Sequence, residues 1–211
     1  MEDFQKCKEE LKTKMIDGLL NYVKDGIVPE NKSAVFIECY NMVLNLGNKD
    51  DSCKELLKYH NEVIEQATNE SYEKIKDLSG DEFIDSFITY TERLNCLILK
   101  MTKIFSYLNR YCLRFKKGEL SHFSMDIYKK SFFDKLKDKL FPLLKELVNK
   151  EGKDENAENK IKTIMKIIDS LDFIKPKINK ISKTSAEWIE GNKEEKENPK
   201  AYQKMWNEFK A

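Results

Sequence analysis

The amino-acid sequence predicts an all-α protein, an elongated stack of antiparallel helical bundles. Charged residues make up 36% of the 211 residues, and glycine and proline number only 7 and 4, which favours long helices with exposed faces. Apolar residues recur every three or four positions along most of the chain, and no segment alternates as a strand would. The links between these segments are short, so neighbouring helices are expected to pack antiparallel.

The first two helical patterns differ in how much of their surface is apolar. The first runs from about residue 4 to residue 24 and ends at Gly26 and Pro29. The second begins at Ser33, a suitable N-cap, and continues to about Leu46. It is apolar over most of its circumference, so it is either buried on two sides or awaits a partner on one. A narrow polar strip interrupts it, formed by Glu38, Asn41 and Asn45.

Three further patterns complete the first half of the chain. A long helix is expected over residues 51–78, and Asp81 can cap a short helix to about residue 90. A fifth helix is expected over residues 92–115, because its apolar residues share one face. These are Leu94, Leu97, Ile98, Met101, Ile104, Phe105, Leu108, Cys112 and Phe115.

One aromatic residue near the end of the fifth pattern lies off its apolar face. At about 100° per residue, Tyr107 falls on the charged side of the helix, with Lys103 and Arg110. Either a partner protein covers this side chain, or a neighbouring helix of the same chain does. The three arginines of the chain lie within 22 residues here, among 35 lysines, and a guanidinium makes oriented contacts that an ammonium cannot. They are Arg93, Arg110 and Arg114.

The second half of the chain has a weaker pattern. A long helix is expected over residues 122–150, with a kink or break at Pro142. A polar loop over residues 150–159 and an amphipathic helix over residues 160–172 follow. A last helix is expected over residues 201–209.

Composition argues against several classes of function. The formal net charge is +1, from 38 basic and 37 acidic residues, so an electrostatically driven nucleic-acid binder is not expected. The five cysteines include no Cys-x-x-Cys pair, which predicts no zinc site and fits a reducing cytoplasm or nucleus. We find no signal peptide and no apolar run near the roughly 18 residues of a membrane span. No nucleophile, base or ligand cluster is visible, so we expect no enzyme, no metal and no cofactor.

An ordered string of motifs resembles the N-terminal region of cullins, the scaffolds of modular ubiquitin ligases. The resemblance covers roughly residues 10–150. Its most specific part is Tyr-Leu-Asn-Arg, followed about twenty residues later by Ile-Tyr and then by Leu-Phe-Pro-Leu. The string consists of Leu56-Leu57-Lys58-Tyr59, Phe87, Tyr90, Tyr107-Leu108-Asn109-Arg110-Tyr111, Asp126-Ile127-Tyr128, Phe132-Phe133, Leu140-Phe141-Pro142-Leu143 and Leu147-Val148-Asn149-Lys150-Glu151.

The resemblance implies a stalk of five-helix cullin repeats, with the first repeat in residues 1–118 and a second, not necessarily complete, in residues 119–211. In cullins the second and fifth helices of the first repeat form the adaptor-binding surface. For Val43, Leu108 and Tyr111, packing in the core and contact with a partner both remain open. The residues of this chain that match the family's partner-binding positions are Phe36, Ile37, Tyr40, Leu44, Tyr107, Arg110 and Tyr111.

The implied partner is an S-phase-kinase-associated adaptor, as in SCF-type ligases, or a BTB-domain adaptor of related fold, and through it F-box receptors. The RING subunit, nucleic acid and membranes are not expected to bind this segment. Two departures from the family pattern stand out: Tyr90 is the nearest residue to a usual tryptophan, and Cys39 replaces a larger apolar residue. Two alternatives remain: a short stand-alone cullin-like protein that sequesters adaptors, or a helical tethering subunit unrelated to ubiquitin.

Overall fold

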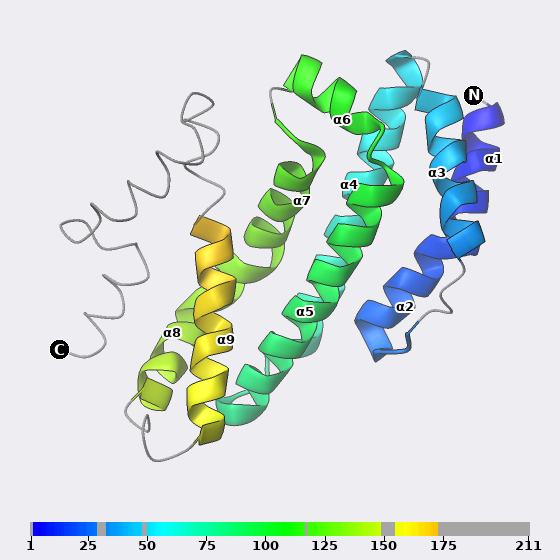
Figure 1. The fold of residues 1–211 in the computed structure, drawn as a ribbon. Coiled ribbons are helices and arrows are strands. Elements are labelled where there is room, and N and C mark those ends of the chain that lie inside the picture. Colours follow the sequence, from blue (N-terminus) through cyan, green and yellow to red (C-terminus); the bar gives the residue numbers. More distant parts are fainter. Residues whose placement is uncertain (1, 29–32, 48–49, 117, 149–154, 173–211) are drawn as a thin grey trace. The chain divides into compact units, whose positions relative to one another are not determined.

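Helices make up all the regular structure that the computed structural model describes, and no strand occurs in those residues, which confirms the all-α class (Figure 1). The chain divides into two compact units, residues 1–137 and 138–211. The predicted boundary between repeats at residue 118 and the predicted elongated shape stay predictions. The structure describes residues 2–28, 33–47, 50–116, 118–148 and 155–172.

The first predicted helix is present as three successive segments. α1 (Glu2–Leu11), the π-helical segment η1 (Lys12–Ile16) and α2 (Asp17–Asp25) follow one another without a gap. Their inner face carries a line of almost fully buried side chains, which anchors the run against the rest of the unit. These are Leu11, Ile16, Leu19 and Val23.

The end of α2 is fixed by a glycine and an arginine. Gly26 adopts the left-handed conformation with φ of 75°, and its amide donates to the carbonyl four residues earlier at 2.9 Å. The guanidinium of Arg93 donates to the carbonyl oxygens of Val23 and Lys24 at 3.3 and 3.5 Å and lies over the ring of Tyr90. The last carbonyls of a helix have no partner within it, so the hydrogen bonds from Arg93 stabilise the end of α2.

We expect Gly26→Ala to lower the free energy of unfolding by about 1–3 kcal/mol, because the left-handed backbone disfavours a side chain and the methyl group has no room. A Cβ at this position would lie 2.4 Å from Nη2 of Arg93 and would displace the guanidinium from the carbonyls. Gly80→Ala is the matched control, since Gly80 has φ of 57° and nothing within 4 Å of an added Cβ. Urea unfolding of both variants measures the free energy of unfolding. Equal losses in the two variants would mean that the Arg93 contact does not contribute to stability.

The second and third predicted helices are confirmed as α3 (Ser33–Gly47) and α4 (Asp50–Ile75). α4 ends three residues before the predicted end at Leu78. α3 packs against α4 and α5, and also against η1 and α1 (Figure 1). The stripe of α4 that faces the core is buried and contains Leu56, Val63, Ile64, Ala67 and Ile75.

α5 (Gly80–Ile104) runs straight through the position where a break between two helices was predicted. The prediction of a short helix over residues 81–90 and a new helix from residue 92 is therefore wrong. Thr91 interrupts the apolar stripe in the sequence, but in the structure it is fully buried. Its Oγ1 lies 3.1 Å from the hydroxyl of Tyr128, so the polar group has a partner and the helix continues.

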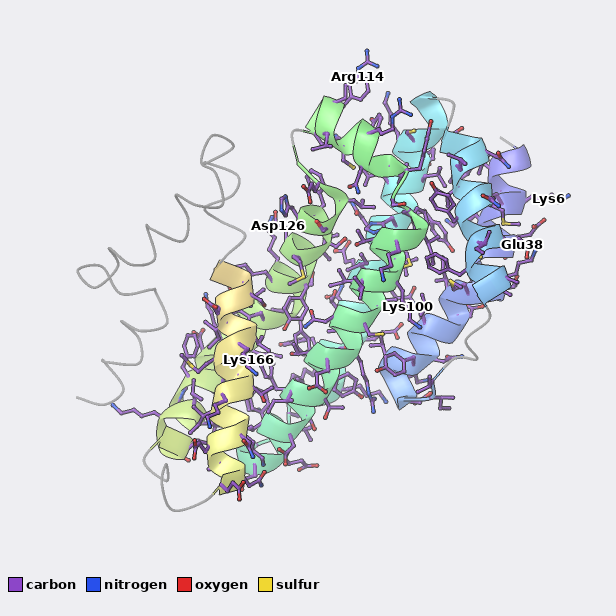
Figure 2. The ribbon with its side chains drawn as sticks, in the orientation of Figure 1. Lys6, Glu38, Lys100, Arg114, Asp126 and Lys166 are labelled. Atoms are coloured by element: carbon purple, nitrogen blue, oxygen red, sulfur yellow. The ribbon has the colours of Figure 1, made fainter. Side chains whose placement is uncertain are left out.

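The helical path turns at residues 105–107, where α5 gives way to the short helix α6 (Leu108–Tyr111) and the π-helical segment η2 (Cys112–Lys116). Cys112 is fully buried, as predicted, but Phe115 is 50% exposed, so its predicted place on the buried face is wrong. A π-helical turn holds more residues than an α-helical turn, and the third residue after Cys112 therefore does not return to the core. Figure 2 shows Arg114 of this segment pointing away from the helices.

α7 (Leu120–Tyr128) and the π-helical segment η3 (Lys129–Phe133) complete the first unit and pack against α4; α7 also packs against α5. The rings of Phe87 and Phe132 stack with centroids 5.8 Å apart, which joins α5 to η3. The core of this unit is thus closed by elements that follow the predicted repeat boundary in the chain.

α8 (Asp134–Val148) leads into the second unit, where α9 (Glu155–Asp172) follows. The helix continues past Pro142 to Val148 without the break that the sequence suggested. Pro142 is exposed, so the carbonyl that loses its hydrogen bond faces water. Residues 155–159 were predicted as loop and are helical, whereas the helix predicted over residues 201–209 lies outside the described residues. The buried side of α9 comprises Ala157, Ile161, Ile164, Ile167, Ile168 and Leu171.

Candidate protein-interaction surface

The inner face of α3 is narrow, and large apolar side chains flank it on both sides. Cys39 and Val43 are fully buried, which places both in the core. Phe36, Tyr40 and Leu44 are only half-buried. The rest of the unit therefore covers the apolar surface of α3 only in part, and contact of the remainder with a partner stays a prediction.

Ile37 is the most exposed apolar residue of α3, with 58% of its surface accessible. It lies beside Glu38 and one turn before Asn41, which are also exposed. The exposed part of the Ile37 side chain does not stabilise the fold of the free chain, because apolar surface contributes to stability only when another surface covers it.

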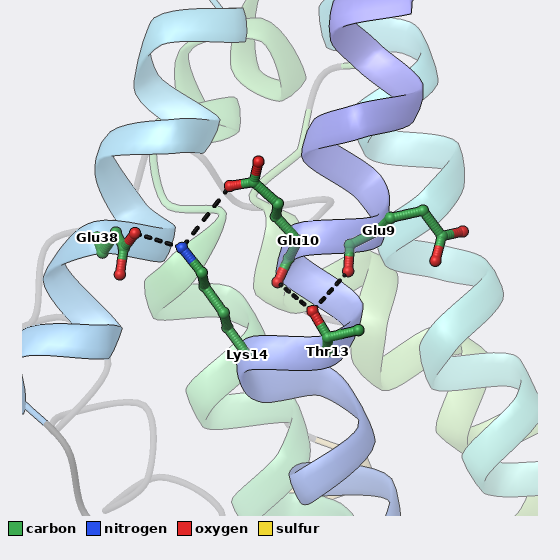
Figure 3. A network of polar contacts seen from close by, with 5 residues as sticks. All are labelled: Glu9, Glu10, Thr13, Lys14 and Glu38. Carbon is green, nitrogen blue, oxygen red and sulfur yellow. Dashed lines mark hydrogen bonds and ion pairs between the residues drawn. The ribbon is translucent and has the colours of Figure 1, made fainter.

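Glu38, the acid in the polar strip of α3, forms an ion pair within the chain. Glu38 pairs with Lys14 of η1, and Lys14 also lies 3.7 Å from a carboxylate oxygen of Glu10 (Figure 3). The hydrogen bond with Glu38 raises the pKa of Lys14 above its ordinary value. Thr13 donates to the carbonyls of Glu9 and Glu10 within the same turn. This exposed network connects α3 to η1 and so orients the face that carries Ile37.

The second part of the predicted surface follows the end of α5. Tyr107 is half-buried and Arg110 is exposed, with its guanidinium carbon 5.8 Å from the centre of the Tyr107 ring. This contact of cation and ring holds both side chains in a defined orientation. Leu108 is fully buried and Tyr111 is 8% exposed, so the structure gives both a place in the core. The predicted partner contact of Tyr111 stays a prediction.

Asn109, the third residue of the Tyr-Leu-Asn-Arg motif, has a structural role. Its side-chain oxygen accepts a hydrogen bond from the backbone amide of Leu120 at 2.9 Å, at the start of α7. The first amides of a helix lack partners within it, so this side chain caps α7 from eleven residues away. The motif thus combines the half-buried Tyr107, one core position at Leu108, a cap at Asn109 and the exposed Arg110.

The two parts of the predicted surface belong to the same unit. α3 and α5 pack against each other, and both run toward the end of the unit where the turn to α6 begins (Figure 1). That α3 and the segment from Tyr107 to Tyr111 form one binding surface stays a prediction. The two segments are 60 residues apart in the chain and belong to one unit.

Several exposed apolar residues were not predicted as candidates. Leu99 of α5 is 56% exposed and Leu113 of η2 is 57% exposed, like Phe115 beside it. The periodic pattern assigned Phe115 to the core and did not include the other two. One signal in the sequence could have indicated this region, because residues 93–118 contain seven basic and no acidic side chains.

Burial raises the pKa of Cys7 and of Cys112 to about 11, so both thiols stay protonated. No group of three or more histidine, cysteine, aspartate or glutamate residues suited to a metal ion occurs in the part of the chain that the structure describes. No helix in that part is both long and apolar enough to pass through a membrane.

A stack of helices in which one apolar helix, here α3, is only partly buried is typical of a protein-interaction scaffold. The family model described as the cullin alpha solenoid domain matches residues 13–183. The chain therefore belongs to the cullin family, whose domain of this kind is a scaffold, and the resemblance drawn from the motifs is confirmed. No curated protein matches the chain significantly, and no solved structure does.

Proposed function

We propose that this chain is the adaptor-binding part of a cullin-type ubiquitin-ligase scaffold. It holds an S-phase-kinase-associated or BTB-fold adaptor and thereby brings substrate receptors to the ligase. The observation that carries the proposal is α3: a helix of a cullin domain that leaves Ile37 largely exposed and Phe36, Tyr40 and Leu44 half-exposed. Aromatic and large aliphatic residues at the centre of an interface usually supply most of its binding energy.

Two features support α3 and the Tyr107–Tyr111 segment as one binding surface. Both belong to the same unit, in which α3 packs against α5, and each combines an aromatic residue with a polar neighbour that has a partner within the chain. Glu38 is held by Lys14, and Arg110 is held over Tyr107. Side chains that are already ordered in the free protein lose less conformational entropy when a partner binds.

The direct test is calorimetric titration of the full chain with a purified S-phase-kinase-associated adaptor and, separately, with a BTB-domain adaptor. We expect saturable binding of at least one adaptor with one chain per adaptor. Failure of both adaptors to bind the folded chain would leave the helical tethering role as the better explanation.

Arg110→Lys should weaken adaptor binding by about 1 kcal/mol, in the range of one charge-assisted hydrogen bond, although the charge is kept. The planar guanidinium rests on the ring of Tyr107 and can present two parallel donors, a geometry that an ammonium lacks. The folded state should be unaffected, because Arg110 is exposed. Titration beside a melting curve checks both points; unchanged affinity would show that the guanidinium does not touch the adaptor.

A further inference from the structure

The tip of the first unit formed by α6 and η2 carries a positive charge that the chain as a whole lacks. The protein is nearly neutral, yet residues 93–118 hold seven basic side chains and no acid. Arg93 is used by the fold, where it binds the end of α2. Arg110 and Arg114 are exposed, and neither forms an ion pair with any described residue. Their charge is therefore available to a partner.

Two apolar side chains stand beside these arginines. Leu113 is 57% exposed and Phe115 is 50% exposed, because the π-helical turn directs them away from the core. The ring of Phe115 packs against Tyr111 at 4.9 Å between centroids, and the guanidinium of Arg114 lies 5.1 Å from its centre on another side. Phe115 is therefore held in place although water reaches half of its surface.

The choice of arginine indicates what kind of partner this tip suits. The chain contains 35 lysines and three arginines, and two of the three lie here on the surface. A diffuse anionic surface such as a membrane is attracted equally well by lysine, whereas carboxylates held in a fixed geometry are bound by the planar arginine fork. The exposed Leu113 and Phe115 beside Arg114 call for an apolar group near the acids of the partner.

We propose that the adaptor-binding surface extends onto the tip formed by Leu113, Arg114 and Phe115, where it binds an acidic segment of the adaptor that carries an apolar side chain. This inference rests on the proposed function. It adds which groups of the adaptor contact the tip. Carboxylates bind Arg110 and Arg114, and an aliphatic or aromatic side chain packs on Leu113 and Phe115.

Calorimetric titration of the adaptor against full-length variants tests the extension. Arg114→Gln is expected to weaken binding about tenfold, the effect of one charge-assisted hydrogen bond, and to make the affinity less sensitive to salt. Leu113→Ala combined with Phe115→Ala is expected to weaken it about tenfold through lost apolar contact. The controls are Lys130→Gln, an exposed charge on η3, and Ile27→Ala with Val28→Ala, two exposed apolar residues after α2.

The outcomes separate this inference from the proposed function. If no adaptor binds the wild-type chain, the proposed function fails and the extension fails with it. If the wild type binds but Arg114→Gln and the apolar double variant bind equally well, only the extension is overturned. Arg114 is exposed and points away from the helices, so Arg114→Gln stays informative even if the double variant melts early (Figure 2).

A second arm uses vesicles of equal parts phosphatidylcholine and phosphatidylserine. We expect the chain not to sediment with them at physiological salt. Sedimentation that is lost in Arg114→Gln, together with unchanged adaptor affinity, would assign the tip to an anionic lipid surface and overturn the proposal.

Discussion

Replacing Tyr40 and Tyr107 together by alanine is expected to weaken adaptor binding by about 4 kcal/mol, since an aromatic hot spot contributes roughly 2 kcal/mol or more. Each side chain is half-buried, so its inner part is fixed by the fold while its outer part remains for a partner. The two tyrosines come from the two segments of the proposed surface, and the double change removes an anchor from each. Calorimetric titration of the folded variant with the adaptor measures the loss.

The control for this change must remove similar side chains elsewhere. Tyr22 of α2 and Tyr72 of α4 are also half-buried and lie outside the proposed surface. Tyr22→Ala combined with Tyr72→Ala should destabilise the fold about as much as the first pair and leave adaptor affinity unchanged. Strong unfolding of the Tyr40 and Tyr107 variant with wild-type affinity would place both tyrosines in the core and remove them from the binding surface.

The helices of this chain could be predicted from its sequence because each one buries a stripe of apolar residues at helical spacing. The prediction was wrong where tertiary contacts decide the structure. The predicted break after residue 90 is wrong because Thr91 is buried in the core, where its hydroxyl lies 3.1 Å from that of Tyr128, 37 residues away. α8 continues past Pro142. Both Pro142 and Asp138, whose carbonyl loses its hydrogen bond to the proline, are exposed to water.

The candidate surface was predicted in part. The excess of apolar residues on α3 predicts a partner. The structure leaves Ile37 exposed and Phe36 and Tyr40 half-buried, and the contact with a partner stays a prediction. The tip at Leu113 and Phe115 was missed, since counting at 3.6 residues per turn assigned Phe115 to the core. The π-helical turn that exposes it is set by how η2 fits against the rest of the unit, and residue spacing does not reveal it.

His60 is one of the fully buried polar residues of the first unit. Its Nδ1 lies 3.0 Å from the side-chain oxygen of Asn61, and its Nε2 lies 3.5 Å from the hydroxyl of Ser124 on α7. The edge of the ring meets Phe105, the residue at which α5 ends, with centroids 5.3 Å apart. One imidazole therefore connects α4, α7 and the turn that leads to Tyr107.

This histidine should make the stability of the protein depend on pH. Burial lowers the pKa of His60 from 6.5 to about 4, opposed only by the hydrogen bond with Asn61. Between these values the unfolded chain binds a proton that the folded chain does not, so the free energy of unfolding falls as the pH falls from 6.5 to about 4. At about 1.4 kcal/mol per pKa unit, the loss over this window is of the order of 3 kcal/mol.

The measurement is urea unfolding at a series of pH values for the wild type and for His60→Gln, which keeps a neutral polar group of similar size. The wild type should lose stability toward pH 4, and the variant should lose less, because its amide does not titrate in this window. Carboxylates that titrate near pH 4 contribute equally to both proteins and cancel in the difference. Parallel curves for wild type and His60→Gln would mean that the buried imidazole is protonated in the folded state without loss. A difference of the expected size would show that acid loosens the packing of α4, α7 and Phe105, and with it the support beneath Tyr107 and Arg110.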